Sequence, residues 1–142
     1  LTYEAPPRNE GYNLICIHPD PRHRLRKGEK AQVRVQVKSR YSTTSNRAVP
    51  LKEDRRDAFD FLVVVFLNIG NFGRGGDGRE GAAPPEFYTL PARVARRTHD
   101  TRNAWKKISL RGKDKEMARY RDENGFERIA VALGVEPPQR RA

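Results

Sequence analysis

The sequence predicts an α/β (α+β) fold in which a central mixed β-sheet is flanked by helices, and three segments carry this prediction. Residues 31–40 alternate apolar and polar side chains, and residues 61–67 (FLVVVFL) are apolar throughout. Phe126, Ile129, Ala130 and Leu133 repeat with helical spacing. Alternation indicates a strand with one covered face, a continuous short apolar run indicates a strand covered on both faces, and the last spacing indicates an amphipathic helix.

The first half of the chain predicts a long antiparallel hairpin. Residues 12–17 form its first strand and residues 31–40 its second, joined by the basic connector 20–30, which turns at Lys27-Gly28. Residues 1–10 are polar and contain two prolines, so we expect an irregular lead-in. Residues 41–58 are rich in Ser, Thr and charged side chains and predict a loop with little regular structure.

The second half predicts the centre of the sheet and its helical cover. Residues 61–67 are the central strand, and the glycine-rich residues 68–86 predict a flexible loop. The GRGGDG in that loop matches a dinucleotide-binding pattern, but Gly81 and Pro84-Pro85 exclude the helix that such a site requires. The chain is expected to be one domain, residues 1–142, with its core in 11–133.

The remaining elements follow from local signals. Residues 87–90 predict a strand and residues 92–98 a helix with Pro91 as its first residue. Residues 105–110 predict a short edge strand whose lysines discourage further pairing. In the last helix, Asn124 and Glu127 resemble a capping box, and Gly134 marks the end.

The charge balance favours a polyanionic partner. Twenty-nine Lys and Arg against 18 Asp and Glu give a net charge of +11 and a pI near 10.3. Nucleic acid is favoured over a membrane, because no apolar run approaches the roughly 20 residues that span a bilayer. A basic surface that is merely solvated is the alternative.

The single cysteine bears on the compartment. Cys16 has no intrachain disulfide partner, which suits a reducing, cytoplasmic environment. Cys16 with His18 and His23 lacks the second ligand pair of a zinc site. The chain begins at Leu1 rather than at methionine, which suggests a preceding segment.

The motif Q-x-K lies on the predicted strand 31–40. Strand periodicity places Gln36 and Lys38 side by side on the polar face. In the order of its elements over residues 11–133, with this motif, the chain resembles the PD-(D/E)xK superfamily, the restriction-endonuclease-like fold, in its Q-x-K branch. The resemblance implies a metal-dependent phosphodiesterase acting on DNA, a nuclease of the endonuclease or hydrolase kind. The leading helix of that family has no counterpart here, which is consistent with a removed or swapped segment.

The resemblance also assigns the site. Lys38 corresponds to the catalytic lysine, which orients the attacking water and offsets charge on the phosphorus. Gln36 stands at the second metal-ligand position and Asn13 at the first, where YNL replaces the family's YDL. The metal is Mg²⁺ or Mn²⁺, which prefers carboxylate oxygens, so two neutral ligands hold it poorly. Asp20, in the turn HPDP, is an alternative carboxylate, although turn formation is its ordinary role.

Other acidic residues of the chain also bear on the predicted metal site. Glu4, Glu10 or a glutamate preceding the chain are other sources of a carboxylate, whereas Asp60 is a strand-boundary residue.

Basic side chains supply the binding half of this hypothesis, with double-stranded DNA as the expected partner. The candidates for phosphate contacts are Arg22, Arg24, Arg26, Lys27, Arg34, Arg40, Arg47 and Lys52, with Lys30, Arg55, Arg56, Arg93, Arg96 and Arg97 as further members of the same groove.

Two other functions stay open. One is a degenerate member of the fold that binds DNA without cleaving it, marked by Asn13 and Gln36. The other is a basic RNA-binding protein, which explains the charge but not the Q-x-K strand. A homo-oligomer is compatible with either.

Overall fold

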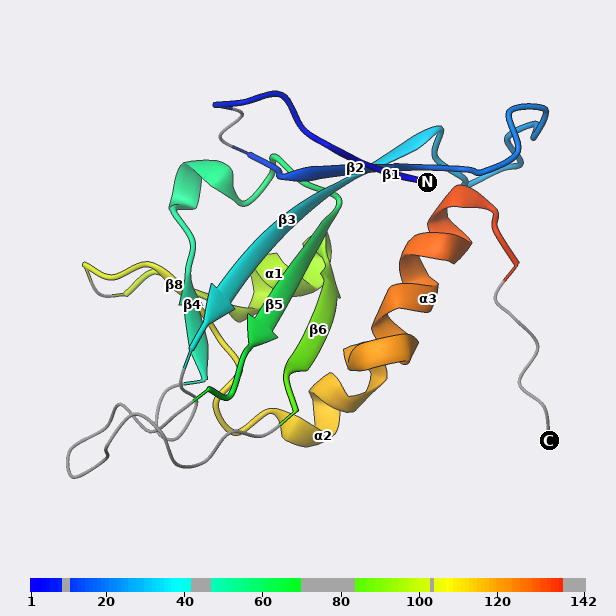
Figure 1. The fold of residues 1–142 in the computed structure, drawn as a ribbon. Helices are drawn as coiled ribbons and strands as arrows, with labels where there is room; N and C mark the ends of the chain where they lie inside the picture. Colours follow the sequence, from blue (N-terminus) through cyan, green and yellow to red (C-terminus); the bar gives the residue numbers. More distant parts are fainter. Residues whose placement is uncertain (9–10, 42–46, 70–83, 103, 137–142) are drawn as a thin grey trace, which may run out of the picture.

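The computed structural model describes residues 1–8, 11–41, 47–69, 84–102 and 104–136. The chain forms a mixed α/β structure with two sheets and several short helices (Figure 1). The five-stranded sheet, called sheet A, has the order β1-β2-β3-β5-β6, and the three-stranded sheet, called sheet B, has the order β4-β8-β7. The predicted class, a mixed sheet with helices, is therefore confirmed.

Sheet A contains the predicted hairpin and the predicted buried strand. Its strands are β1 (Thr2–Glu4), β2 (Leu14–Ile17), β3 (Gln32–Arg40), β5 (Phe61–Phe66) and β6 (Glu86–Pro91). Strand β2 pairs antiparallel with β3, β3 pairs parallel with β5, and β5 pairs antiparallel with β6. Every residue of β5 is buried, as the continuous apolar run predicts for a strand between two others.

Several sequence-based boundaries and assignments were wrong. Residues 2–4 are not irregular, because β1 pairs antiparallel with β2. Residues 41–58 are not wholly a loop, since β4 (Ala48–Pro50) and the 3₁₀ turn η1 (Glu53–Arg55) lie within them. Alternation over so few residues gives too weak a signal for strands that are stabilised by distant partners. The predicted glycine-rich loop lies largely outside the described residues.

Sheet B was not foreseen as a sheet. It consists of β4, β7 (His99–Asp100) and β8 (Lys107–Ser109), and β8 is its middle strand rather than an edge strand. Lys107 and Ser109, on either side of the buried Ile108, are tolerated there because only Ile108 enters the core.

The helices cover both faces of sheet A. Helix α1 (Ala92–Thr98) and sheet B lie against one face, and α3 (Asp122–Leu133) lies against the other. In the chain, α2 (Asp114–Met117) and the turn η2 (Ala118–Tyr120) come between β8 and α3. Helix α1 has the bounds predicted from the sequence, and Pro91, which ends β6, is its N-cap rather than its first helical residue. None of the described helices has the length and apolar character needed to cross a bilayer.

The start of α3 also differs from the prediction. Its N-cap is Arg121, and no side chain caps the helix, so Asn124 lies inside the first turns instead of forming a capping box. Gly134 ends the helix with a left-handed φ of 80°, as predicted. Phe126 belongs to the predicted apolar stripe but is 43% exposed, with its ring centre 5.7 Å from that of Phe87.

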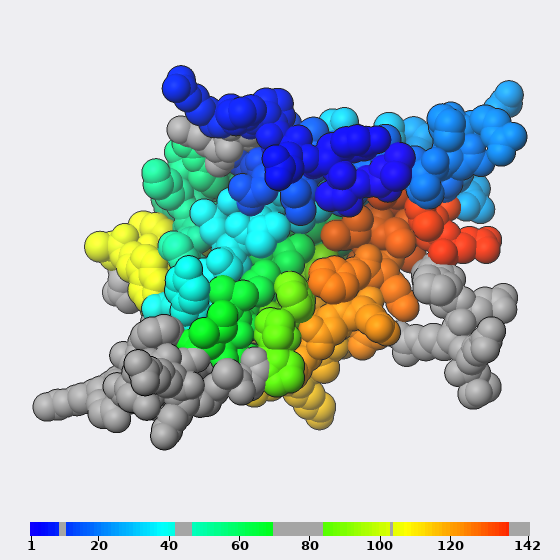
Figure 2. Space-filling view, in the orientation of Figure 1, coloured from blue at the N-terminus to red at the C-terminus, as the bar shows by residue number. Residues whose placement is uncertain are grey.

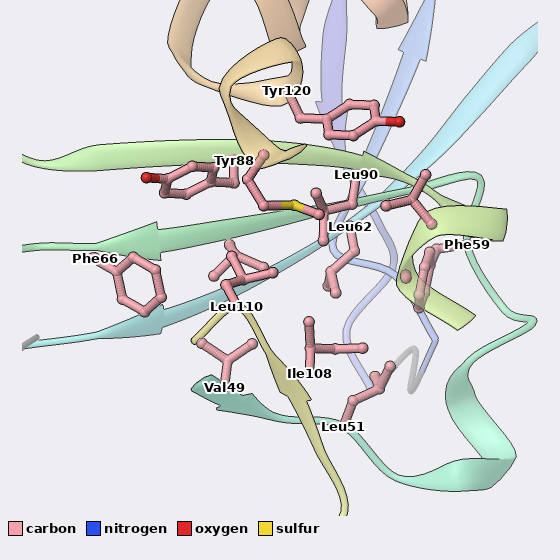
Figure 3. Packing of buried hydrophobic residues seen from close by; sticks show 14 residues of the cluster. Val49, Leu51, Phe59, Leu62, Phe66, Tyr88, Leu90, Ile108, Leu110 and Tyr120 are labelled. Carbon is pink, nitrogen blue, oxygen red and sulfur yellow. The ribbon is translucent and has the colours of Figure 1, made fainter. Parts of the chain in front are cut away.

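Two apolar clusters hold these layers together. The larger lies between sheet A and sheet B and includes Leu62, Phe66, Leu90 and Ile108 (Figure 3). The smaller lies beneath α3 and is formed by alternate residues of the same strands, including Val35 and Val63. The two faces of β3 are thereby distinguished: its valines enter the cluster under α3, and its polar residues face the side of sheet B.

The β2–β3 connector reaches the end of α3. The backbone N–H of Lys30 donates to the carbonyl of Ala132 at 2.8 Å, and Glu29 lies beside Gly134. Figure 2 shows this light blue connector against the red C-terminal end of α3. Segments from the two ends of the described chain thus close on each other.

Candidate functional site

A pocket of about 610 Å³ lies beside β3, on the side of sheet B. Three segments build it: Gln36 and Lys38 come from β3, the second wall comes from β4 and η1, and the third comes from the loop before β8. Figure 1 shows the last two segments on the same side of β3. The lining residues are Gln36, Lys38, Pro50, Leu51, Lys52, Arg55, Ala104, Trp105 and Lys106.

The alternation of β3 brings the two motif residues into this pocket. Val35 and Val37 turn toward the cluster under α3, so Gln36 and Lys38 lie on the opposite face. Gln36 is only 9% exposed, and its side-chain amide has no hydrogen-bond partner among the described residues. The pocket therefore contains a nearly buried amide whose donors and acceptor are available to a ligand.

Among the described residues, the charged side chains that line the pocket are all basic. They are Lys38, Lys52, Arg55 and Lys106. Asp54 is an acidic neighbour of this group: its well-exposed carboxylate lies 3.7 Å from the Arg55 guanidinium. Cationic side chains around a concavity with protein walls create a positive potential that concentrates anions. The pocket is suited to an anion such as a phosphate group.

Trp105 adds an aromatic surface. It is the single tryptophan of the chain and is 38% exposed. The Arg40 guanidinium lies 5.3 Å from the centre of its ring and the Lys107 ammonium 4.7 Å from it. Both contacts are within the range of a cation–π interaction. The indole is held at the pocket by cations on long, adaptable side chains.

Asn13 lies directly across from Gln36. Its backbone N–H donates to the carbonyl of Val35, and its side-chain oxygen accepts the N–H of Val37, both at 2.8 Å. The side chain thus extends the β2–β3 hydrogen-bond ladder by one step. Asn13 therefore lies beside Gln36, but it is not among the residues that line the pocket with Gln36 and Lys38.

Asp20 does not join them. Its carboxylate accepts the backbone N–H of Arg22 at 2.9 Å, and these bonds, with the Arg22 guanidinium, lower its pKa. Ile17, the last residue of β2, pairs with Gln32, the first residue of β3. Asp20 follows Ile17 in the chain and therefore lies beyond the end of this strand pair that is farther from Lys38. Four residues of strand, about 13 Å at the usual rise, separate Gln32 from Gln36. Asp20 is a turn-forming residue.

Asp60 is occupied by other partners. It accepts the Arg34 backbone N–H at 2.8 Å, and its carboxylate lies 3.5 Å from the Lys30 ammonium. Burial alone would raise the pKa of Asp60, but the hydrogen bonds and positive charges of Arg34 and Lys30 outweigh it and lower the pKa. Asp60 fixes the entry of β5 next to β3, which agrees with its reading as a strand-boundary residue.

The residues around Lys38 do not fit the Mg²⁺ or Mn²⁺ that the resemblance implies. The side-chain oxygen of Asn13 already accepts a backbone N–H, and Gln36 offers a neutral oxygen beside Lys38. Hard divalent cations require carboxylates, and nearby ammonium groups repel them. The described residues also contain no group of three or more His, Cys, Asp or Glu side chains arranged for a metal.

The basic residues predicted to bind DNA are divided among several places. Lys52 and Arg55 line the pocket, and Arg40 lies over Trp105 while donating to the Ala48 carbonyl. Arg47 forms an ion pair with Glu86 at 2.8 Å, which raises the arginine pKa and lowers that of Glu86.

Other basic side chains lie away from the pocket. Arg34 contacts Asp60, Arg96 contacts Asp57 and Arg97 contacts Glu116. The connector between β2 and β3 carries Arg22, Arg24, Arg26 and Lys27, all exposed.

Sequence reasoning missed Trp105 and Lys106 as site residues. They were assigned to an edge strand, and their place in the pocket depends on the pairing of β8 with β4, which no local pattern indicates. The signal that could have found them is the single tryptophan followed directly by two lysines.

Comparisons with protein-family models, with curated proteins and with solved structures found no match. The functional assignment therefore rests on the pocket itself.

Proposed function

We propose that this chain binds DNA through its phosphate groups at the pocket around Lys38, as a domain of the restriction-endonuclease-like kind that does not cleave. The observation that carries the proposal is the convergence of four basic side chains from three segments on one concave site. Exposed cations attract phosphate generally, but convergence from distant segments gives a defined place for it.

The likeness to the restriction-endonuclease-like fold is supported by the placement of the motif. The Q-x-K strand β3 lies inside a mixed sheet, next to the parallel and fully buried β5, with helices on both faces. The resemblance implies this kind of mixed, helix-flanked sheet. Asn13 across from Gln36 agrees with the order of the family's site residues.

The donor set favours binding over cleavage. Neutral Asn13 and Gln36 replace the carboxylates that would hold a metal, and the remaining charged side chains of the pocket are cations. Such a site attracts a phosphodiester and binds a divalent cation only weakly.

A Mg²⁺-dependent deoxyribonuclease is the second candidate. The observation that favours it is that Gln36 and Lys38 line one pocket, with Asn13 next to Gln36 on the neighbouring segment. Cleavage would need at least one carboxylate from outside this group.

Fluorescence anisotropy with a labelled DNA tests the proposal. Lys52→Ala with Arg55→Ala should weaken binding by about tenfold or more, since phosphate contacts are removed from the pocket. Arg111→Ala with Lys115→Ala removes the same charge from exposed sites that do not line it.

Equal losses in the two double variants would show that the net charge alone binds DNA, and absence of binding by the wild type would overturn the proposal. Incubation of the wild-type protein with DNA and Mg²⁺ or Mn²⁺ tests the second candidate, which cleavage would support.

A further inference from the structure

We infer that the pocket accepts one unpaired nucleotide, so that the chain prefers single-stranded DNA over a duplex of the same sequence. This inference rests on the proposed DNA binding and names its substrate class. It starts from three features of the pocket: its size, its aromatic wall and its nearly buried amide.

The size of the pocket suits a single nucleotide. A volume of about 610 Å³ lies within the range of small-ligand sites, which runs from roughly 300 to 1,000 Å³. A base paired within a duplex is held in its stack and cannot enter such a concavity without being extruded, which costs a few kcal/mol. An unpaired base pays much less of this cost.

Trp105 supplies a stacking surface for that base. Proteins that bind single strands combine a basic groove with aromatic side chains on which bases stack. Here the indole lies beside Lys106 in the wall of the pocket, 38% exposed. The long side chains of Arg40 and Lys107, now over the ring, can move to the phosphates as a base takes their place.

Gln36 supplies hydrogen bonds to the base. Its amide carries two N–H donors and one acceptor, which match the mixed donor and acceptor edge that an unpaired base exposes. The side chain is nearly buried and has no hydrogen-bond partner among the described residues. A base edge at this position would satisfy polar atoms that otherwise depend on solvent in a confined site.

Cations on two walls of the pocket are partners for the phosphates. Lys52 and Arg55 lie on the segment that follows β4, and Lys38 lies beside Gln36 on β3. A nucleotide with its base at Trp105 and Gln36 would place its backbone among these cations. A duplex could contact the outer cations but would leave Gln36 and Trp105 unused.

The single tryptophan makes the test direct. Trp105 fluorescence should be quenched on titration with an unlabelled oligo(dT) and change little with a duplex of equal length. Anisotropy with labelled strands should show single-stranded DNA binding at least about tenfold more tightly than the duplex, the scale of one base stacked on an aromatic residue.

Variants separate the base contacts from the charge. Trp105→Ala and Gln36→Ala should each remove most of the single-strand preference while duplex binding stays within about twofold. Tyr3→Ala deletes an exposed aromatic side chain of β1 and should leave the preference intact. Circular dichroism of each variant establishes that it is folded.

The outcomes distinguish this inference from the proposed function. If both DNA forms bind equally and Trp105 is not quenched, the inference fails while the DNA-binding function stands. If neither form binds, the proposed function fails and the inference with it. A preference that survives both Trp105→Ala and Gln36→Ala would also overturn the inference, because the base would then be recognised elsewhere.

Discussion

Asn13 shows how one side chain can serve structure where the resemblance would place chemistry. Its oxygen completes the β2–β3 ladder by accepting the Val37 N–H, and this bond requires only an acceptor. An aspartate could make the same bond and would add a negative charge opposite Gln36. At this position asparagine thus keeps the structural hydrogen bond without adding a negative charge.

We therefore predict that Asn13→Asp with Gln36→Glu creates a divalent-metal site. One carboxylate would lie just before β2 and the other next to it on β3, and Lys38 would offset the cost of their mutual repulsion. Isothermal titration with Mn²⁺ should show binding to the double variant and much weaker binding to the wild type. Asn13→Asp with Gln32→Glu has the same charge change, but places the second carboxylate four residues away, and should not bind comparably. Equal binding by both variants would contradict the prediction.

At the scale of elements, the contact between β4 and β6 joins the two sheets. Arg47 directly precedes β4. Its guanidinium forms an ion pair with Glu86 at the start of β6 and also donates to the hydroxyl of Tyr88 at 3.0 Å. The Arg47 side chain lies over the ring of Phe66, 4.5 Å from its centre. Arg47, assigned to DNA from sequence, is held in this half-buried network instead of lining the pocket.

We predict that Glu86→Gln lowers the free energy of unfolding by about 2 kcal/mol, the usual scale for hydrogen bonds to a charged group. The pKa of Glu86 is lowered, chiefly by its hydrogen bonds from Arg47. The ionised form therefore stabilises the fold above the ordinary glutamate pKa, and this stability is lost as the pH falls through the lowered value. Urea unfolding from pH 7 to pH 3 should show a weaker acid dependence in Glu86→Gln than in the wild type. Glu53→Gln, at an exposed position, should leave both quantities nearly unchanged.

The junction between α3 and the β2–β3 connector permits a second prediction at this scale. Gly134 has a φ of 80°, and a Cβ there would come within 2.5 Å of the Glu29 carboxylate. Gly112 has a φ of 73° and open space around it. Gly134→Ala should thus destabilise more than Gly112→Ala, because both pay the left-handed strain of about 1 kcal/mol but only the first displaces Glu29. Thermal unfolding of both variants measures the difference, and equal shifts would show that Glu29 moves aside freely.

For the whole molecule, the net charge of +11 sets the response to salt. The affinity for duplex DNA should fall with a log–log slope of about −0.9 for each phosphate neutralised. Lys52→Ala with Arg55→Ala should reduce the steepness by about 1.8, the value for two lost contacts. Titrations between 50 and 300 mM salt would measure both slopes. A slope unchanged by the double variant would place the phosphate contacts outside the pocket.

The sequence predicted the parts of the fold that local patterns determine. The alternation of β3, the apolar run of β5 and Gly134 at the end of α3 are local signals, and all three predictions were confirmed. Sheet B escaped prediction because β4 pairs with the distant β8, and because β7 and β8, with two and three residues, are too short to show a strand pattern. The local alternation of β3 was enough to place Gln36 and Lys38 on one face of the strand. The other two walls of the pocket depend on pairing in sheet B and could not be predicted in this way.

The three-part construction of the pocket has a consequence for how the protein is made. Residues 36–38, 50–55 and 104–106 meet only after β8 has paired with β4. A ribosome must therefore release the chain through Ser109 before this concavity is complete, and until then the wall that carries Trp105 and Lys106 is missing. Nascent chains stalled before β8 should bind polyanions only loosely, and the selective site should appear abruptly with the closing strand.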